Sequence, residues 1–395
     1  MIRKAVFFLN VACLFALLPV LGAYASEGIP AYPDKETVTH LRTAYKAEQE
    51  YDAELQAGNY SKGYVKRLFG STAQGSLLLA MHDDENLWIS HDGGVSWKSC
   101  FICQKRKSHS GPVFGKSILD IAEDRMRKIL YLATGDGVFR SRDEGRSWKR
   151  FSQGLPYENH EFLTPTILKL SLDPDSGDLY GEVSLDGFGI YKTGCDKADW
   201  KPIGAGLPES SITGEVSYGS AEKAVFVVQG RAGAIMISGY KASSTGIYKG
   251  VPQGSEFHWV HDELPLKRGD FDPVHSLNAD PNGGEVYACT FAGLYRKTRD
   301  SWVSVLNRSF INSVFFEEGN KKRALAIAAG GCFLLSENAW RPISGGWDQR
   351  AIISSACFLN GAIFVGTNEG LFASRDNGSS WGHLKTPVVV PVKGK

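Results

Sequence analysis

The sequence predicts an all-β protein, a seven-bladed β-propeller with four-stranded antiparallel blades, and three repeated patterns support this prediction. The first is the motif S-x-D-x-G-x-S-W, found at residues 90–97, 141–148 and 374–381. The second is a small polar turn followed by Gly, an aliphatic residue and an aromatic residue, as in TGDGVF (134–139) and TNEGLF (367–372). Repeating four-stranded units of about 40–50 residues are typical of propeller blades.

The third pattern, a series of tryptophans 38 to 59 residues apart, gives the number of blades. One tryptophan follows the third strand expected in each unit: Trp97, Trp148, Trp200, Trp259, Trp302, Trp340 and Trp381. The clearest unit has β-branched and aromatic runs at 117–122, 129–134, 138–141 and 147–152, separated by Gly and Asp. Such runs between turn residues indicate consecutive antiparallel strands. The innermost strands are expected to begin near Tyr64, Ser117, Ile167, Ile212, Val274, Ile311 and Ile352.

The repeated motif is interpreted as structural. An Asp side chain commonly accepts backbone N–H groups of its own turn, Gly permits positive φ, and Trp buries a large apolar area while its indole N–H finds a partner. At 192–200 and 335–340 the Trp is kept and the Asp is lost, which suits packing better than chemistry. The structural residues are Ser90, Asp92, Gly94, Trp97, Ser141, Asp143, Gly145, Trp148, Ser374, Asp376, Gly378 and Trp381.

The N-terminal residues 1–25 are typical of a cleaved secretory signal peptide, with a basic start, an apolar core and an A-x-A site. An uncleaved membrane anchor is the alternative, disfavoured because the apolar stretch is short and Pro19 interrupts it. Residues 26–59 form a separate segment with an amphipathic helix predicted over 34–57, and the propeller is assigned to 60–395. The tail at 387–392 is expected to add a strand that protects an edge.

The charge balance gives no reason to expect a nucleic-acid partner. Removal of the signal peptide leaves 42 basic and 43 acidic side chains, without the basic excess of nucleic-acid-binding proteins. No later apolar stretch is long enough to cross a membrane. The mature chain is therefore expected in the periplasm or outside the cell, or in the thylakoid lumen if the host is photosynthetic.

Six cysteines remain after the signal peptide: Cys100, Cys103, Cys195, Cys289, Cys332 and Cys357. Cys100 and Cys103 have C-x-x-C spacing, for which a disulfide, unpaired thiols, a redox role and a metal role all stay open. Cys332 and Cys357 fall in adjacent units and could bridge them, although sequence cannot give connectivity. No cofactor, metal site or catalytic residue is predicted.

The motifs resemble the BNR/Asp-box repeat of sialidases, sortilin-type receptors and xyloglucanases. The longer pattern at 134–148 and 367–381, T-x-x-G-[LV]-F-x-S-R-D-x-G-x-S-W, is similar to that of the photosystem II assembly factor family (Ycf48-like). The resemblance covers about residues 64–385 and implies an exported seven-bladed assembly factor with a protein partner. That family's assembly role is associated with a basic patch on the propeller. Here the basic residues lie mainly in one loop, which departs from the family.

An enzymatic function has less support. Sialidases have six blades and an N-terminal F/Y-R-I-P element that this chain lacks, and xyloglucanases pair two propellers. The basic run with His109 is either a solvated loop or a docking site for an acidic partner. The candidate binding residues are Lys105, Arg106, Lys107, His109, Arg231, Arg268 and Arg350. A wider set of polar loop candidates comprises Asp83, Asp84, Glu85, His109, Asp136, Glu158, His160, Glu161, Asp186, Arg231, Lys267, Arg268, Asp270, Asp272, Arg308, Trp347, Asp348, Arg350 and Glu369.

The sequence thus predicts an exported, non-catalytic propeller that acts as a binding or assembly scaffold for a protein partner or an envelope or membrane complex. The alternative is a glycan-acting enzyme or glycan-binding module of the sialidase or xyloglucanase type, with two convergent carboxylates near the axis. Function is carried by sites placed on the fold, so the motifs predict the fold better than the activity.

Overall fold

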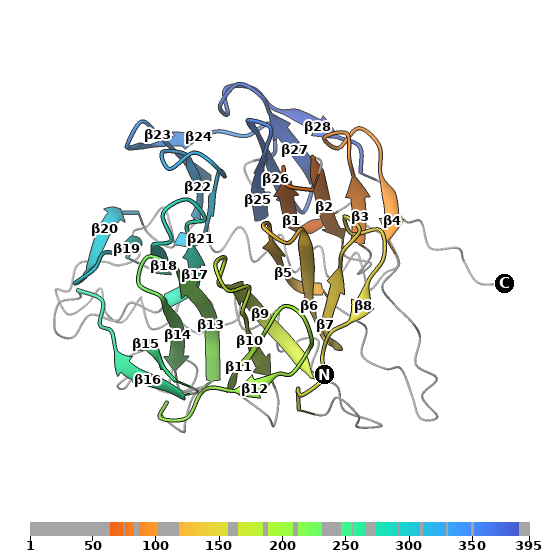
Figure 1. The fold of residues 1–395 in the computed structure, drawn as a ribbon. Coiled ribbons are helices and arrows are strands. Elements are labelled where there is room, and N and C mark those ends of the chain that lie inside the picture. Colours follow the sequence, from red (N-terminus) through yellow and green to blue (C-terminus); the bar gives the residue numbers. More distant parts are fainter. Residues whose placement is uncertain are drawn as a thin grey trace, which may run out of the picture. The chain divides into compact units, whose positions relative to one another are not determined.

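The protein is a seven-bladed β-propeller made only of strands in the part of the chain that the structure describes (Figure 1). Each of its seven antiparallel sheets contains four strands that are consecutive in the sequence. The fold class predicted from the sequence is confirmed. The computed structural model describes residues 64–74, 76–82, 87–100, 118–156, 165–184, 189–207, 212–230, 246–254, 256–265, 274–290, 292–308, 311–328, 331–348 and 351–386.

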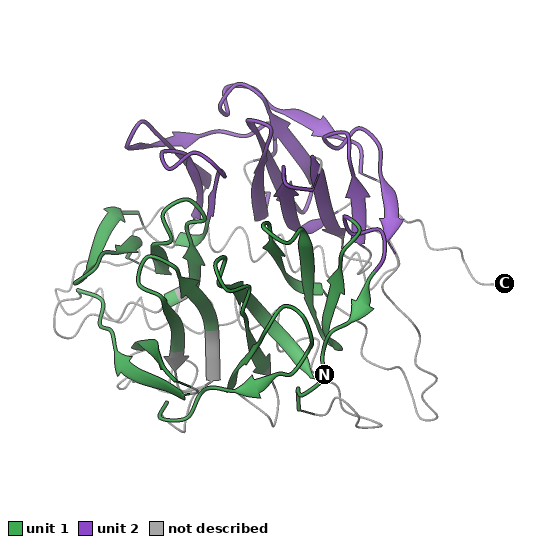
Figure 2. Ribbon diagram, in the orientation of Figure 1, with its two compact units in different colours: residues 1–34, 104–143, 148–314 green, residues 35–103, 144–147, 315–395 purple. Residues whose placement is uncertain are grey.

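The signal peptide at 1–25, the helix predicted over 34–57 and the tail strand at 387–392 lie outside the described residues. The chain divides into two compact units (Figure 2). Unit 1 contains residues 1–34, 104–143 and 148–314, and unit 2 contains residues 35–103, 144–147 and 315–395.

Unit 1 contains blades 2 to 5. Each has the same order, from an innermost strand of six to eight residues to an outermost strand at the edge. The strands are β5 (Ile118–Asp124), β6 (Ile129–Thr134), β7 (Gly137–Ser141) and β8 (Lys149–Arg150) in blade 2; β9 (Thr166–Leu172), β10 (Leu179–Ser184), β11 (Gly189–Thr193) and β12 (Lys201–Pro202) in blade 3; β13 (Ile212–Gly219), β14 (Ala224–Gly230), β15 (Gly246–Gln253) and β16 (Glu256–His261) in blade 4; and β17 (Val274–Ala279), β18 (Val286–Thr290), β19 (Leu294–Lys297) and β20 (Trp302–Leu306) in blade 5.

Unit 2 contains blades 1 and 7 and most of blade 6, whose first strand begins in unit 1. The strands are β1 (Val65–Ser71), β2 (Leu77–His82), β3 (Leu87–Ser90) and β4 (Lys98–Cys100) in blade 1; β21 (Ile311–Phe316), β22 (Ala324–Ala328), β23 (Gly331–Ser336) and β24 (Ala339–Ile343) in blade 6; and β25 (Ile353–Leu359), β26 (Ala362–Thr367), β27 (Gly370–Ser374) and β28 (Gly382–Leu384) in blade 7.

The seven innermost strands begin within one residue of the positions predicted from the sequence. Their accuracy has a simple cause, because each starts where a loop of turn residues gives way to alternating apolar residues. Strand β5 shows this alternation in its burial, with Ile118, Asp120 and Ala122 buried and Leu119 and Ile121 half-buried. The second strands β6, β18, β22 and β26 are buried along their whole length.

The first and last blades pack against each other within unit 2. The Leu68 backbone N–H donates to Ser355 Oγ at 3.1 Å, which joins β1 to β25. Val65 and Leu68 belong to the same buried cluster as Phe364 and Leu371. The two blades farthest apart in the sequence are therefore neighbours, joined without exchange of a strand between the described residues of the two sheets.

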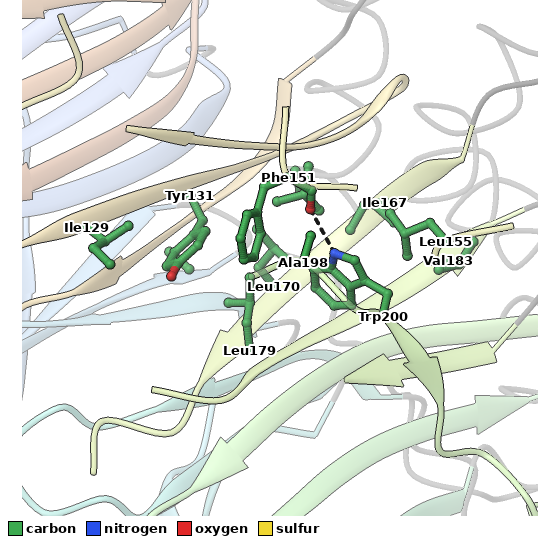
Figure 3. Packing of buried hydrophobic residues seen from close by; sticks show 13 residues of the cluster. Ile129, Tyr131, Phe151, Leu155, Ile167, Leu170, Leu179, Val183, Ala198 and Trp200 are labelled. Carbon is green, nitrogen blue, oxygen red and sulfur yellow. Dashed lines mark hydrogen bonds between the residues drawn. The ribbon is translucent and has the colours of Figure 1, made fainter. Parts of the chain in front are cut away.

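The core of unit 1 lies between consecutive blades, as the cluster of blades 2 and 3 shows (Figure 3). Trp200 is 2% exposed, and its indole Nε1 donates to the Phe151 carbonyl of blade 2 at 2.8 Å (dashed in Figure 3). Phe151 in turn packs against Tyr131, with ring centroids 5.6 Å apart. Large aromatic side chains dominate such cores because each removes roughly 150–250 Å² from water.

Six innermost strands carry a β-bulge at equivalent positions. In β5 the residues Ile118 and Asp120 pair with the adjacent residues Thr134 and Ala133 of β6, so one residue is inserted. The same register shift occurs in β1, β9, β13, β17 and β25. A bulge redirects the side chains that follow it, and here these are Arg67, Asp120, Lys169, Glu215, Ser276 and Ser355.

Candidate functional site

All binding residues predicted from the sequence lie outside the described residues, namely Lys105, Arg106, Lys107, His109, Arg231, Arg268 and Arg350. Five members of the wider polar set are described: Asp136, Arg308, Trp347, Asp348 and Glu369. The structure brings Trp347, Asp348 and Glu369 together in unit 2. It places Asp136 in blade 2, and Arg308 is exposed after β20.

The repeated turn at residues 90–97 is held by its aspartate. Asp92 Oδ1 accepts the Ser90 hydroxyl at 2.7 Å and the Ser96 backbone N–H at 2.9 Å. The Ser96 hydroxyl bonds to the other carboxylate oxygen, and Gly94 N–H donates to Ser90 Oγ at 2.8 Å. Gly94 has φ +87°, a conformation that favours glycine. The carboxylate therefore serves its own hairpin.

The turn at 374–381 repeats this arrangement. Asp376 Oδ1 accepts the Ser374 hydroxyl and the Ser380 N–H, each at 2.8 Å. In the turn at 141–148 the Ser141 hydroxyl likewise donates to Asp143 Oδ1 at 2.8 Å. The hydroxyl and backbone N–H of Ser96 lower the pKa of Asp92 to about 2, and those of Ser380 do the same for Asp376. Both carboxylates are thus ionised and committed to hydrogen bonds.

The prediction that the indole N–H of each motif tryptophan finds a partner is wrong for Trp381. Trp97 Nε1 donates to Gly94 O at 3.0 Å and Trp259 Nε1 to Ile203 O at 2.9 Å. Trp302 Nε1 and Trp381 Nε1 are buried without an acceptor among the described residues. Aromatic packing compensates, because Trp302 meets the Phe226 ring edge-on at 6.0 Å and Trp381 meets that of Trp347 at 4.9 Å.

Threonine-capped turns lie between the second and third strands. The hydroxyl of Thr134, Thr290 or Thr367 donates to the carbonyl of the glycine three residues on, at 2.8 to 3.1 Å. The glycines have positive φ in blades 2, 5 and 7, with Gly137 at +94° and Gly370 at +123°. A positive φ at the glycine lets the second strand turn tightly into the third.

The repeated turn of blade 7 and its threonine-capped turn lie at opposite ends of the blade. Arg323 Nη2 donates to Gly361 O at 3.0 Å and to Asn377 Oδ1 at 2.7 Å, which joins the β25–β26 turn to the repeated turn. The β26–β27 turn is at the other end of β26, where Asn368 N–H donates to Ile352 O at 3.1 Å. Asp376 therefore does not converge with Glu369.

The innermost strands of unit 1 carry a row of charged side chains that link blade to blade. Asp120 Oδ2 of blade 2 accepts the Leu170 N–H of blade 3 at 3.0 Å. Lys169 Nζ of blade 3 pairs with Glu215 Oε2 of blade 4 at 3.0 Å, and the same oxygen accepts the Leu277 N–H of blade 5 at 3.3 Å. These charges are paired with one another and with backbone amides, as buried charges must be.

Sequence reasoning did not single out this row, although a signal was present. Asp120, Lys169 and Glu215 occupy the same place in three innermost strands that are otherwise mostly apolar or small. Alignment of the seven units at the residue after the bulge would have found them. Their role in the structure is to bond the next blade.

In unit 2 the aromatic rings of blade 7 meet the loop that precedes it. Trp347, Glu369, Phe372 and His383 form what we term the rim cluster. Trp347 meets the Phe372 ring edge-on at 5.6 Å, and His383 stacks on Phe372 at 4.7 Å. Glu369 Oε2 accepts the Asp348 N–H at 3.1 Å. Trp347 and Glu369 are half-buried and His383 is exposed, so the cluster is accessible from outside.

Cys332 and Cys357, which the sequence left as a possible bridge, are not linked, and both are buried thiols. They belong to different buried clusters, one around Leu334 and the other around Phe364, so their side chains do not meet. Burial raises the pKa of the Cys332 thiol to about 12 and that of Cys289 further, which suits inert packing thiols. Cys103 of the C-x-x-C pair lies outside the described residues.

Two kinds of feature are absent from the described residues. No group of three or more His, Cys, Asp or Glu side chains there could hold a metal ion. Likewise, none of the described segments is a helix long and apolar enough to cross a membrane.

No family model matches the chain, and no curated protein sequence matches it. Solved structures do resemble it. It is similar to the extracellular domain of the hybrid two-component system BT3049 from B. thetaiotaomicron, with a TM-score of 0.54 and 15% identity over 80% of this chain and 40% of that one. The chain thus spans about two fifths of the length of that domain.

YCF48 from Cyanidioschyzon merolae has a TM-score of 0.50 and 14% identity, over 79% of this chain and 95% of its own. A catalytically inactive virginiamycin B lyase from Staphylococcus aureus, solved with quinupristin, has a TM-score of 0.55 and 10% identity, over 79% of this chain and 94% of its own. At identities this low, the structural similarity shows a shared β-propeller fold and gives no evidence of a shared activity.

Proposed function

We propose that the chain is an exported, non-catalytic propeller that acts as a binding or assembly scaffold for a protein partner or an envelope or membrane complex. The supporting observation is the use of charges on the innermost strands of unit 1. Asp120 and Glu215 accept backbone amides of neighbouring blades, and Glu215 also pairs with Lys169. Carboxylates committed in this way hold blades together and are poorly placed to act as a general acid or base.

Two further observations agree with the proposal. Among the structural neighbours are an extracellular domain and YCF48, both of the propeller fold. The longer pattern at 134–148 and 367–381 is the one that resembles photosystem II assembly factors. An exported location follows from the predicted signal peptide, with the periplasm, the cell exterior and the thylakoid lumen as its possible compartments.

A glycan-binding module is the second candidate, and the rim cluster is the observation that favours it. A half-buried indole beside a carboxylate, as in Trp347 and Glu369, can stack on a sugar ring and accept its hydroxyl groups. The BNR/Asp-box resemblance to sialidases and xyloglucanases is compatible with it.

Cross-linking in the native host tests the scaffold. The tagged exported chain is cross-linked in intact cells, purified, and its cross-linked peptides are identified by mass spectrometry. We expect one recurrent protein partner. Absence of any partner, together with hydrolysis of a glycosidic substrate that is lost in Glu215→Gln, would contradict the proposal. Asp376→Asn, in the repeated turn of blade 7, is the matched control for that loss.

A further inference from the structure

Blades 2 and 7 present the same three positions at the end where the second strand turns into the third. Each has a carboxylate two residues after the turn threonine, an aromatic residue on the third strand and a partner opposite it on the fourth. In blade 2 these are Asp136, Phe139 and Arg150. In blade 7 they are Glu369, Phe372 and His383.

In blade 2 the partner on the fourth strand is the guanidinium of Arg150. Arg150 Nη1 pairs with Asp136 Oδ1 at 3.2 Å and also donates to the Asp136 carbonyl at 2.9 Å. Its Cζ lies 5.9 Å from the centroid of the Phe139 ring. The carboxylate, the aromatic ring and the cation therefore satisfy one another.

Blade 7 has the carboxylate and the aromatic ring but no arginine. His383 stacks on Phe372, with ring planes 23° apart. The Glu369 carboxylate accepts the Asp348 N–H, and no lysine or arginine of the described residues pairs with it. Among the described residues, the position thus carries a carboxylate without the cation that blade 2 supplies.

The loop before blade 7 carries a ring where three other described connections carry leucine. Three corresponding connections end in Leu-Pro, at Leu155, Leu207 and Leu264, and Leu155 is buried. The fourth has Trp347 followed by Asp348. Because leucine suffices for packing at the other three, the larger ring and the added acid are not explained by packing alone.

The loop is also shaped to seat this ring. A Cβ on Gly345 would lie 2.1 Å from atoms of the Trp347 indole, and one on Gly346 would lie 3.1 Å from the Trp381 Cβ. Two successive glycines thus let the backbone approach the rings closely. Trp347 then meets Phe372 and Trp381 edge-on, at 72° and 67°.

We propose that the rim cluster binds the guanidinium or ammonium group of a basic side chain of a protein partner. Glu369 pairs with the cation and Trp347 offers its ring, as Asp136 and Phe139 do for Arg150 in blade 2. A cation fits better than a sugar because the molecule holds a cation at the equivalent place. The proposal rests on the scaffold function and names the chemistry that the partner presents.

A titration followed by NMR tests the proposal. The exported protein is labelled with ¹⁵N at its tryptophan indoles and titrated with a capped Gly-Arg-Gly peptide. The same peptide with citrulline in place of arginine keeps the shape and removes the charge. We expect a saturable shift of the Trp347 indole signal, assigned by its loss in Trp347→Leu, with the arginine peptide and not with the citrulline peptide.

Three variants separate the site from the fold. Trp347→Leu restores the residue of the other connections, and Glu369→Gln removes the charge without changing size. Each should weaken binding of the arginine peptide about tenfold. Because Trp347→Leu lacks the Trp347 signal, its binding is followed from the shift of the Trp381 indole signal. His383→Arg recreates the arrangement of blade 2 and should block binding by supplying the cation from within. Asp376→Asn, at the opposite end of blade 7, is the matched control and should bind like the wild type.

Equal shifts with the citrulline peptide, or unchanged binding in Glu369→Gln and His383→Arg, would overturn the proposal. So would saturable shifts with cellopentaose but none with the arginine peptide, which would favour the glycan candidate. The scaffold function is judged separately: a partner still cross-linked by Glu369→Gln retains the scaffold and rejects this site. If no partner cross-links at all while the peptide binds, the scaffold fails and a cation site remains.

Discussion

Two kinds of connection lead into the outermost strand, and they use tryptophan differently. In the intact turn at 90–97 the indole of Trp97 bonds to Gly94 of its own turn, and the side chain is half-buried. In the connection ending at Trp200, where the motif aspartate is lost, the indole donates to the carbonyl of Phe151 in the preceding blade and is almost fully buried. There Thr193 Oγ1 accepts the Asp199 N–H at 2.9 Å, so a hydroxyl organises the turn without the motif aspartate.

The difference separates two roles that the motif combines. The aspartate fixes the hairpin locally, since its bonds stay within four residues. The tryptophan contributes to packing between blades: Trp97 packs on the cluster shared by blades 1 and 7, and Trp200 on that of blades 2 and 3. In the connection ending at Trp200 the packing role is therefore kept although the aspartate is lost.

The largest expected effect is that of Trp200→Ala. It removes a buried indole and its bond to the Phe151 carbonyl, so it should lower the free energy of unfolding by about 3–5 kcal/mol. Trp97→Ala, at a half-buried site with a local bond, should cost roughly 1–2 kcal/mol. Urea unfolding followed by circular dichroism measures both. Equal losses would refute the distinction between the two tryptophans.

Gly154→Ala probes the same packing from the other side. Gly154 has φ +95°, and a Cβ there would lie 2.5 Å from the Trp200 carbonyl oxygen. Gly93 has φ +71° with no atom within 4 Å of its added Cβ. Both alanines carry backbone strain, but Gly154→Ala also clashes, and it should cost about 1–3 kcal/mol more. The difference between their thermal midpoints measures this, and no difference would count against close packing at Trp200.

The smallest expected effect is on the stability of the fold at low pH. The pKa of Asp92 and of Asp376 is lowered from 3.8 to about 2, so the folded state favours the ionised form. Their contribution is complete above pH 4 and is lost as the pH falls through 2. Asp92→Asn with Asp376→Asn should flatten the fall of the thermal midpoint in this range. Ser96→Ala removes the hydroxyl donor, so it should raise the pKa of Asp92 and move that part of the loss to higher pH.

The sequence predicted the units well because each blade is a contiguous stretch with its own strand and turn signals. Tyr64 and Ser117 were each one residue from the observed strand starts, and Thr134 and Thr367 marked real turns. The indole partners were predicted less well. The acceptor of Trp200 lies 49 residues away, on a carbonyl that no sequence pattern marks.

The rim cluster was predicted only in part. Trp347, Asp348 and Glu369 stood among the polar candidates, but Phe372 and His383 did not. A comparison of the units would have identified these two residues, because His383 stands opposite Phe372 as Arg150 stands opposite Phe139. The predicted basic site, in contrast, falls wholly in loops outside the described residues, so Lys105 and its neighbours stay a prediction.

The contact between blades 1 and 7 has a consequence for how such a protein changes over generations. The Leu68 N–H meets Ser355 Oγ, and Gly366 lies against Val65. Each described sheet is continuous in sequence. Deletion of the whole of blade 1 or of blade 7 from the gene would therefore leave every other sheet intact and require a new pair of matching faces at this seam.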